Sequence, residues 1–243
     1  MKTPNYIIKL LIKNMTDKQL LANYLHELGY ETSESLSEPW ANFSLIITDE
    51  FHARQFGRNL LLVKSQPGII FFPIVILLPQ SANGAVWIDA GYDEVLRFPL
   101  RKIELAVRLK SLLHLRAEVE IRYQLIFETL QIGIYWMSSN NRILMANHAF
   151  MNILEYQLPD QIKNKNLSEL GVRFQNNRET FLTTLKRTGK ITGYESFWIL
   201  NSNKKVFIRE NVNVFHDENT DEYYYIGTIE NVSTITVGGV EHG

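Results

Sequence analysis

The amino-acid sequence predicts an α/β part followed by an α+β part, joined by one long helix. Strand-like and helix-like segments alternate in the first half, and its most apolar run, residues 69–78, has the length of a strand buried on both faces. Residues 99–127 form an amphipathic stretch without glycine or internal proline. After Glu128 the pattern changes to alternating strands separated by turn-rich segments, which is typical of an antiparallel sheet.

The order of elements in the first half predicts a doubly wound, five-stranded parallel sheet. Strand-like segments lie at residues 6–12, 43–48, 69–78 and 94–98, and helix-like segments at residues 16–28, 54–65, 82–90 and from Pro99 onward. Parallel strands need right-handed crossovers of about a dozen residues or more, so we expect helices on both faces of the sheet.

The second half predicts a five-stranded antiparallel sheet with helices. Two strands, residues 131–137 and 142–146, are joined by the turn-rich tetrapeptide Ser138–Asn141. Helices are expected at residues 149–156 and 176–187, followed by a three-stranded meander at residues 194–200, 204–214 and 223–232.

Composition excludes several classes of protein. With 25 Lys and Arg against 26 Asp and Glu, there is no basic excess for binding nucleic acid. The absence of cysteine excludes disulfides, cysteine-ligated zinc and a flavin–cysteine adduct. The N-terminus lacks a cleavage signal, and the run at residues 69–78 is about half of the ~20 residues that cross a membrane. We therefore expect a cytoplasmic protein with no membrane partner.

Three segments of the first domain, residues 1–118, carry a family likeness: Ser44–Asp49, Pro73–Leu78 and Ala90–Pro99. In these segments the domain resembles a two-component receiver domain. The first is similar to the strand that ends in the phosphoacceptor aspartate, the second to the fourth strand, and the third to the closing helix and fifth strand. The resemblance implies a flavodoxin-like fold, with Asp49 at the phosphoacceptor position.

The chain departs from this family at the positions that carry its chemistry. Phosphorylation requires an acidic pair for Mg²⁺, a Ser or Thr that ends the fourth strand, and a Lys before the proline. Here Lys13–Asn14, Pro79 and Phe98 occupy these places. A carboxylate accepts a phosphoryl group only where a metal and a cation neutralise the developing charge. We therefore expect a degenerate receiver, a pseudo-receiver that binds proteins, in which Asp49 is an inactive phosphoacceptor equivalent. The alternative roles for Asp49 are a local cap and a solvated carboxylate.

The connecting helix, residues 99–127, overlaps the last helix of the receiver-like domain. An apolar residue recurs every seven positions along it, with one more between, which predicts a parallel homodimer. The residues of this seam are Leu105, Leu112, Leu115, Val119 and Ile126. Because Arg108 and Arg122 take alternate seam positions, the other interpretation is a helix that covers the sheet and then acts as a spacer.

Four segments of the second domain, residues 120–233, carry a family likeness: Tyr123–Glu128, Arg142–Asn147, Gly193–Glu195 and Ile226–Ser233. They appear in the order of the landmarks of a PAS domain, which this domain resembles. The resemblance implies a module that senses small molecules, light or redox state, or that dimerises.

The interior of this domain is expected to be aromatic. The inward candidates are Trp136, Phe150, Leu154, Phe181, Trp198, Phe207 and Tyr225. They can stack on a planar ligand or close-pack into a solid core, and we favour the filled core. No cofactor is expected, because heme needs an axial histidine and both His148 and His216 are expected to face water. Any ligand is expected to be small, apolar or planar.

These observations predict a non-enzymatic, cytoplasmic signal-transduction protein of the two-component type. Its expected partners are a second copy of the chain and a signalling protein, which is a kinase, a regulator or an output protein. The alternatives are a PAS sensor that binds flavin or another chromophore, and the N-terminal sensory part of a histidine kinase or diguanylate cyclase. Residues 234–243 are expected to form a flexible tail.

Overall fold

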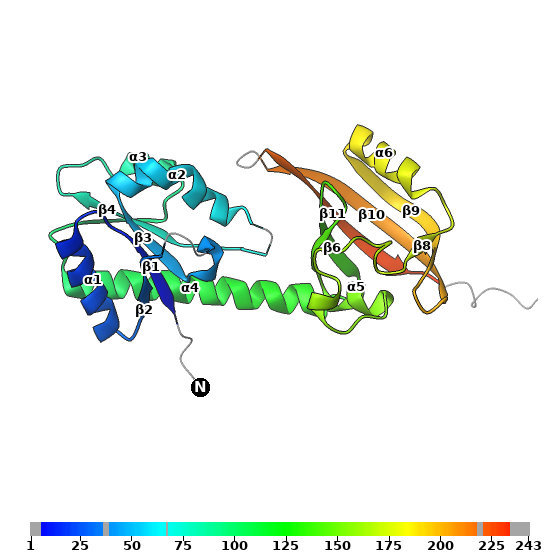
Figure 1. The fold of residues 1–243 in the computed structure, drawn as a ribbon, viewed down its shortest axis with the longest axis horizontal. Helices are drawn as coiled ribbons and strands as arrows, with labels where there is room; N and C mark the ends of the chain where they lie inside the picture. The colour runs from blue at the N-terminus through cyan, green and yellow to red at the C-terminus, as the bar shows by residue number, and fades with distance from the viewer. Residues whose placement is uncertain (1–5, 36–38, 67, 218–220, 234–243) are drawn as a thin grey trace, which may run out of the picture. The chain divides into compact units, whose positions relative to one another are not determined.

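The chain folds into two units, with the boundary between Tyr123 and Gln124 (Figure 1). The computed structural model describes residues 6–35, 39–66, 68–217 and 221–233, so the predicted tail at 234–243 lies outside the described residues. The longest helix, α4 (Lys102–Thr129), runs across the boundary. Each unit has its own hydrophobic core and is described separately.

The first unit is built on a five-stranded parallel sheet. Its strands are β1 (Ile7–Leu11), β2 (Glu31–Ser33), β3 (Leu45–Asp49), β4 (Ile74–Pro79) and β5 (Glu94–Phe98). They lie in the order β2-β1-β3-β4-β5, and every neighbouring pair is parallel. This is the flavodoxin-like order, which confirms the predicted doubly wound sheet.

Helices cover both faces of this sheet. Besides α4, they are α1 (Met15–Glu27), α2 (Glu50–Lys64) and α3 (Ala85–Asp89). Leu25 of α1 and Leu109 of α4 belong to the core on one face, and Leu60 of α2 with Trp87 of α3 to the core on the other. The three-layer arrangement brings the carboxyl ends of the strands to one edge, where such folds place their sites.

Local sequence explains where these helices begin and end. The Asn14 side chain accepts hydrogen bonds from the backbone N–H groups of Thr16 and Asp17, so α1 is capped two residues earlier than the predicted Thr16 box. Gly29, with a φ of +86°, ends this helix as expected. Between β2 and β3 the described residues contain one short 3₁₀ turn, η1 (Trp40–Asn42), in place of a crossover helix.

The second unit is built on a strongly curved antiparallel sheet. Its strands are β6 (Gly133–Ser138), β7 (Ile143–Ala146), β8 (Arg173–Phe174), β9 (Lys190–Ile199), β10 (Lys205–Asp217) and β11 (Glu222–Asn231). Their order is β7-β6-β11-β10-β9-β8, with every pair antiparallel. Five of these strands were predicted, and the sixth, β8, is only two residues long.

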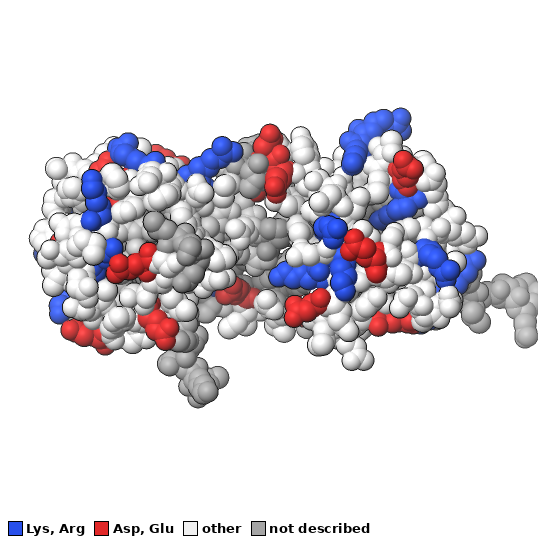
Figure 2. All heavy atoms as spheres, viewed as in Figure 1, with Lys and Arg blue, Asp and Glu red and all other residues white. Residues whose placement is uncertain are grey.

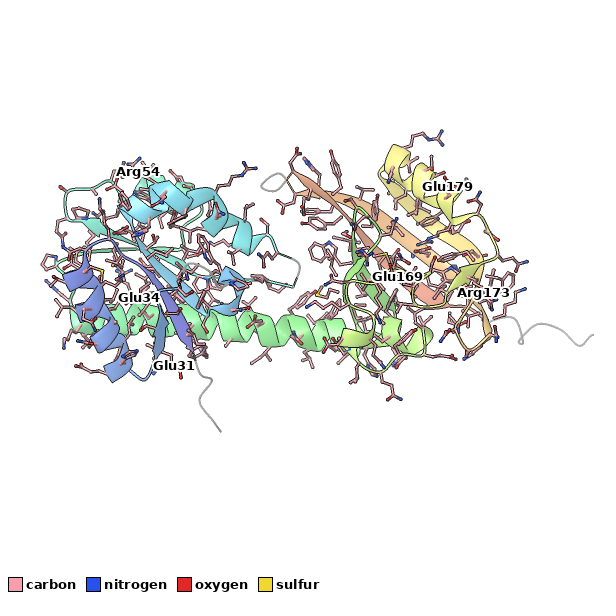
Figure 3. The ribbon with its side chains drawn as sticks, in the orientation of Figure 1. Glu31, Glu34, Arg54, Glu169, Arg173 and Glu179 are labelled. Carbon is pink, nitrogen blue, oxygen red and sulfur yellow. The ribbon has the colours of Figure 1, made fainter. Side chains whose placement is uncertain are left out.

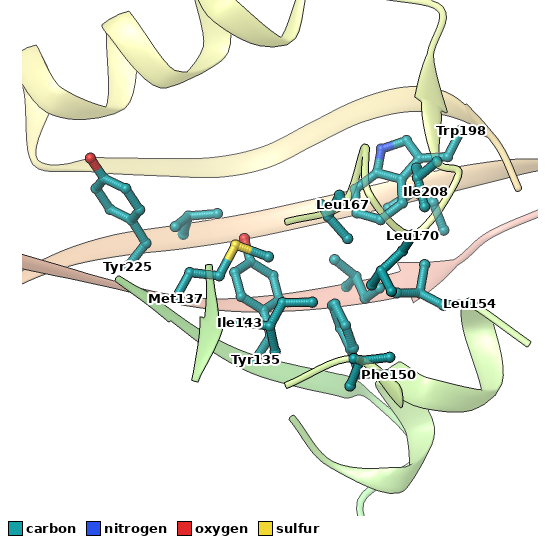
Figure 4. Packing of buried hydrophobic residues seen from close by; sticks show 14 of the residues in the cluster. Tyr135, Met137, Ile143, Phe150, Leu154, Leu167, Leu170, Trp198, Ile208 and Tyr225 are labelled. Atoms are coloured by element: carbon teal, nitrogen blue, oxygen red, sulfur yellow. The ribbon is translucent and has the colours of Figure 1, made fainter. Parts of the chain in front are cut away.

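Short helices cover the inner face of this sheet. They are α5 (His148–Ile153), η2 (Pro159–Gln161) and α6 (Arg178–Thr188). Figure 4 shows Trp198 and Ile208 of the sheet packed with Leu167 and Leu170, which lie in the segment between η2 and β8. This core holds the inner face closed by hydrophobic burial.

The buried side chain of Asn147 ties the end of α4 to the second unit. Its Oδ1 accepts hydrogen bonds from the N–H groups of Ile134 and Phe150, at 2.8 and 3.0 Å. Its Nδ2 donates to the carbonyls of Phe127 and Ile132, both at 2.9 Å. One amide with all its hydrogen bonds satisfied therefore joins α4, β6 and α5.

No helix in the described part of the chain combines the length and the hydrophobicity that a membrane crossing requires. On the face shown in Figure 2, acidic and basic side chains are interspersed, in keeping with a formal charge of -1.

Candidate functional site

Asp49 lies at the carboxyl edge of the parallel sheet, at the end of β3. One of its oxygens, Oδ1, accepts hydrogen bonds from the backbone N–H and from Nδ1 of His52, both at 2.9 Å. The other, Oδ2, accepts one from the backbone N–H of Lys13 at 2.6 Å. Three donors on the two oxygens make Asp49 the N-cap of α2 and its tie to the end of β1.

The four positions that depart from the receiver pattern have structural contacts of their own. The Lys13 ammonium lies 3.9 Å from the centre of the Phe51 ring, and Asn14 caps α1. Pro79 ends β4, and Phe98 packs against the core shared by α1 and α4. None of these side chains supplies a second carboxylate beside Asp49.

Arg97 stabilises the loop that follows β4. Its Nη1 donates to the backbone carbonyls of Pro79, Gln80 and Ala82, at 3.1, 3.1 and 2.8 Å. A groove of about 680 Å³ lies beyond this loop, between α2 and α3, and Val86 and Trp87 line it. Val86 and Ile88 of α3 are exposed apolar residues, so this side of the unit offers apolar surface.

The structure separates the residues of the predicted helix seam. Leu105 is 1% exposed within the core of the first unit, so it is not available to a second copy, contrary to the prediction. Leu112 also packs partly against that core, and Val119 is half-buried. Leu115 and Ile126 are 45% and 61% exposed, so the accessible part of the seam is its C-terminal half.

Five of the seven predicted interior residues of the second unit lie in its core: Phe150, Leu154, Phe181, Trp198 and Tyr225. The prediction was wrong for Trp136 and Phe207, which lie on the outer face of the sheet. Trp136 contacts Tyr224 edge-on at 5.9 Å, and Phe207 contacts Phe197 at 4.6 Å between ring centres. Tyr135, one position before Trp136, faces inward instead, as does Met137 of the same strand.

A buried charged cluster that the sequence analysis missed lies in this core. Glu210 of β10 is 0% exposed and forms an ion pair with Arg178 at the start of α6. The two Arg178 terminal nitrogens donate to the two Glu210 oxygens, and the Tyr135 hydroxyl donates to Glu210 Oε1 at 2.6 Å. The Arg178 guanidinium also lies 4.1 Å from the centre of the Phe181 ring and 5.7 Å from that of Trp198.

The environment of the cluster shifts the pKa values of two members. Burial, together with the neighbouring charge of Glu210, raises the pKa of the Tyr135 hydroxyl well above its usual value. Burial by itself lowers the pKa of Arg178, but the charge and hydrogen bonds of Glu210 outweigh this effect and raise it above its usual value. The cluster is therefore a neutral phenol beside a fully formed ion pair.

Two cavities border Arg178. The larger, of about 770 Å³, lies between β8, the first turn of α6 and the β9–β10 turn, and four asparagines and two arginines contribute to its lining: Asn176, Asn177, Asn201, Asn203, Arg173 and Arg178. The smaller, of about 250 Å³, is lined by Met137, Asn141 and Leu182 among others. Figure 3 labels Arg173 at β8 and Glu179 in α6, which both line the larger cavity.

The histidines of the second unit lie where they were expected. His148, the first residue of α5, and His216, near the end of β10, are both exposed. His216 contacts Asp221 at 2.8 Å and stacks on Tyr223. Among the described residues no group of three or more His, Asp or Glu side chains has the arrangement of a metal site.

Comparison with known proteins identifies the second unit. The family model of the PAS domain matches residues 132–234, so this segment is a PAS domain. No curated protein matches the chain.

Solved structures similar to the chain include isolated PAS domains. One, from a two-component sensor histidine kinase, has 12% sequence identity and a TM-score of 0.40, and the match covers 47% of this chain and 98% of the other. The PAS domain of an HTR-like protein from Haloarcula marismortui has 16% identity and a TM-score of 0.39, with coverage of 48% and 93%. That of nitrogen regulation protein NR(II) from Vibrio parahaemolyticus has 13% identity and a TM-score of 0.38, with coverage of 45% and 96%.

Proposed function

We propose that this chain is a non-enzymatic signal-transduction protein of the two-component type that acts in the cytoplasm. Its first unit is a degenerate receiver that transmits a signal by binding another protein, and its PAS domain senses a ligand or dimerises. The observation that carries the proposal is the state of Asp49, which caps a helix at the phosphoacceptor position. The flavodoxin-like strand order supports the assignment of the first unit.

The contacts of Asp49 argue against phosphoryl transfer. Both carboxylate oxygens already accept hydrogen bonds from Lys13 and His52, so an attack on phosphorus requires one of these bonds to break. The residues after β1 are Lys13 and Asn14, which bring no negative charge for Mg²⁺. Binding through exposed apolar surface, such as the α2–α3 groove, needs none of this chemistry.

Incubation of the purified chain with acetyl phosphate and Mg²⁺, followed by intact mass spectrometry, tests the proposal. We expect no phosphorylated species under conditions that fully phosphorylate a functional receiver run in parallel. The Asp49→Asn variant is the matched control, because asparagine caps a helix as well as aspartate does. A gain of one phosphoryl group in the wild type that is absent from Asp49→Asn would refute the proposal.

The alternative of a chromophore-binding PAS sensor makes a different prediction. Five of the seven candidate interior residues pack into the core of the PAS domain, and the chain contains no cysteine for a flavin adduct. We therefore expect the protein purified from its native source to show no visible absorption. A flavin spectrum or a heme Soret band would favour the alternative.

A further inference from the structure

The Arg178 guanidinium lies at the border of two cavities in the PAS domain. Ser168, Phe174 and Arg178 line both cavities, of about 770 and 250 Å³. A buried ion pair such as Arg178 with Glu210 is often no more stabilising than apolar residues of similar volume. Stability alone therefore gives little reason for a charge at this place.

The guanidinium is fixed in position and retains hydrogen-bonding capacity. Glu210 accepts two of its five N–H groups, Tyr135 interacts with a third, and three aromatic rings surround it, including Phe181 at 4.1 Å and Phe174 at 5.0 Å. The other two N–H groups have no acceptor among the residues that the structure describes. A rigid guanidinium with unused donors binds a carboxylate without an ordering cost.

The charges around the larger cavity are of both signs. Arg173 and Glu179 line it in addition to Arg178, and neither forms an ion pair within the described residues. Glu210 pairs with Arg178 from the core and is not part of the lining. The lining therefore offers guanidinium groups to a carboxylate and the carboxylate of Glu179 to a cation, which suits a molecule that carries one charge of each sign.

We propose that this cavity binds a small zwitterion, an amino acid, with its carboxylate on Arg178 and Arg173 and its ammonium group on Glu179. This inference rests on the proposed sensory role of the PAS domain and names its ligand class. It replaces the apolar or planar ligand that the sequence predicts. The asparagine side chains of the lining supply further donors and acceptors for a polar ligand.

Titration of the full ¹⁵N-labelled chain with L-alanine, followed by NMR, tests the proposal. The signals to follow are the indole N–H of Trp198 and the Nε–H of Arg178, since the indole ring centre lies 5.7 Å from the guanidinium. Propionate and ethylamine are matched control ligands, because each has one of the two charged groups on the same carbon skeleton. We expect saturable shifts with L-alanine in the millimolar range and much weaker ones with either control.

Variants separate the proposed site from general charge effects. Arg173→Gln and Glu179→Gln change exposed side chains and leave the core intact, and each is expected to weaken binding by about two- to fivefold. Arg209→Gln, on the outer face of the sheet, is the matched control and is expected to leave binding unchanged. The proposal is overturned if L-alanine causes no saturable shift, if propionate or ethylamine binds as well, or if Arg209→Gln weakens binding equally. None of these outcomes bears on the phosphorylation state of Asp49, so they leave the proposed role of the first unit untouched.

Discussion

Replacement of Arg178 by alanine is expected to destabilise the PAS domain far more than the loss of a surface arginine does. Glu210 is 0% exposed, and in the variant its carboxylate loses both hydrogen bonds from the guanidinium while its neighbours on the sheet stay apolar. Removal of one partner from a buried ion pair costs about 3 to 5 kcal/mol. The exposed pair of Arg209 with Glu195 is the comparison, since such pairs contribute about 0.2 to 1 kcal/mol.

Hydrogen–deuterium exchange measured by mass spectrometry provides the assay, because peptides from β9, β10 and β11 report the opening free energy of the second unit alone. The double variant Arg178→Met, Glu210→Gln removes both charges and keeps an acceptor for the Tyr135 hydroxyl, so it is expected to recover most of the loss. The reasoning is wrong if Arg178→Ala costs less than about 1 kcal/mol, as Arg209→Ala should. It is also wrong if the double variant is as unstable as Arg178→Ala.

Three further predictions follow from single contacts. A Cβ added at Gly227 would lie 2.3 Å from the Tyr135 ring, so Gly227→Ala should destabilise the second unit by about 1 to 3 kcal/mol in the same exchange assay. Thr192→Ala, at an exposed position of β9, is the control and should change this free energy by less than about 0.5 kcal/mol. Burial raises the pKa of Tyr92 from 10.0 to about 12, so the folded state favours the neutral phenol. The stability that this preference gives the first unit is fully present below pH 10 and is lost as the pH rises from 10 to 12. The Tyr92 hydroxyl has no hydrogen-bond partner in the described part of the chain, so Tyr92→Phe should stabilise the first unit by about 1 kcal/mol at pH 7. Urea denaturation at pH 7 and pH 11 should also show a smaller loss of stability at the higher pH in this variant than in the wild type. An equal loss in both proteins would contradict the raised pKa of Tyr92. If α4 forms a homodimer through the accessible half of its seam, Leu115→Asp with Ile126→Asp should give monomers in light scattering, with the exposed Ile103→Asp as control. A wild type that is monomeric at about 10 to 100 μM, well above a micromolar dissociation constant, would reject the dimer.

The sequence predicted most elements of the fold because their apolar patterns are strong. The apolar run at residues 74–79, which forms β4, and the alternation of buried and more exposed residues along β10 and β11 leave little choice of fold class. The missed strand β2 has the sequence Glu-Thr-Ser and lies at the edge of its sheet, so no apolar run marks it. The missed strand β8 has two residues, and only its pairing with β9 defines it.

The interior of the PAS domain was harder to predict because β6 is apolar on both faces. Tyr135 and Trp136 fit either side by type, and a shift of one residue exchanges the faces. A signal for the buried cluster was nevertheless present in β10. Its inward positions alternate as Val206, Ile208, Glu210 and Val212, which places one carboxylate among apolar residues. A buried acid requires a basic partner, and the sequence alone does not show that this partner is Arg178.

The carboxyl edge of the parallel sheet is fixed by contacts of Asp49, Arg97 and Phe98. Asp49 caps α2, and its Oδ2 accepts the backbone N–H that follows β1. Arg97 fixes the loop after β4 through three carbonyls, and Phe98 is packed in the core. A switch requires two arrangements of similar free energy, with a ligand or a modification that favours one of them. Each of these contacts stabilises a single arrangement of the edge. Under the function proposed above, the first unit would therefore present one constant surface to a partner, and the variable part of the signal would have to come from the PAS domain.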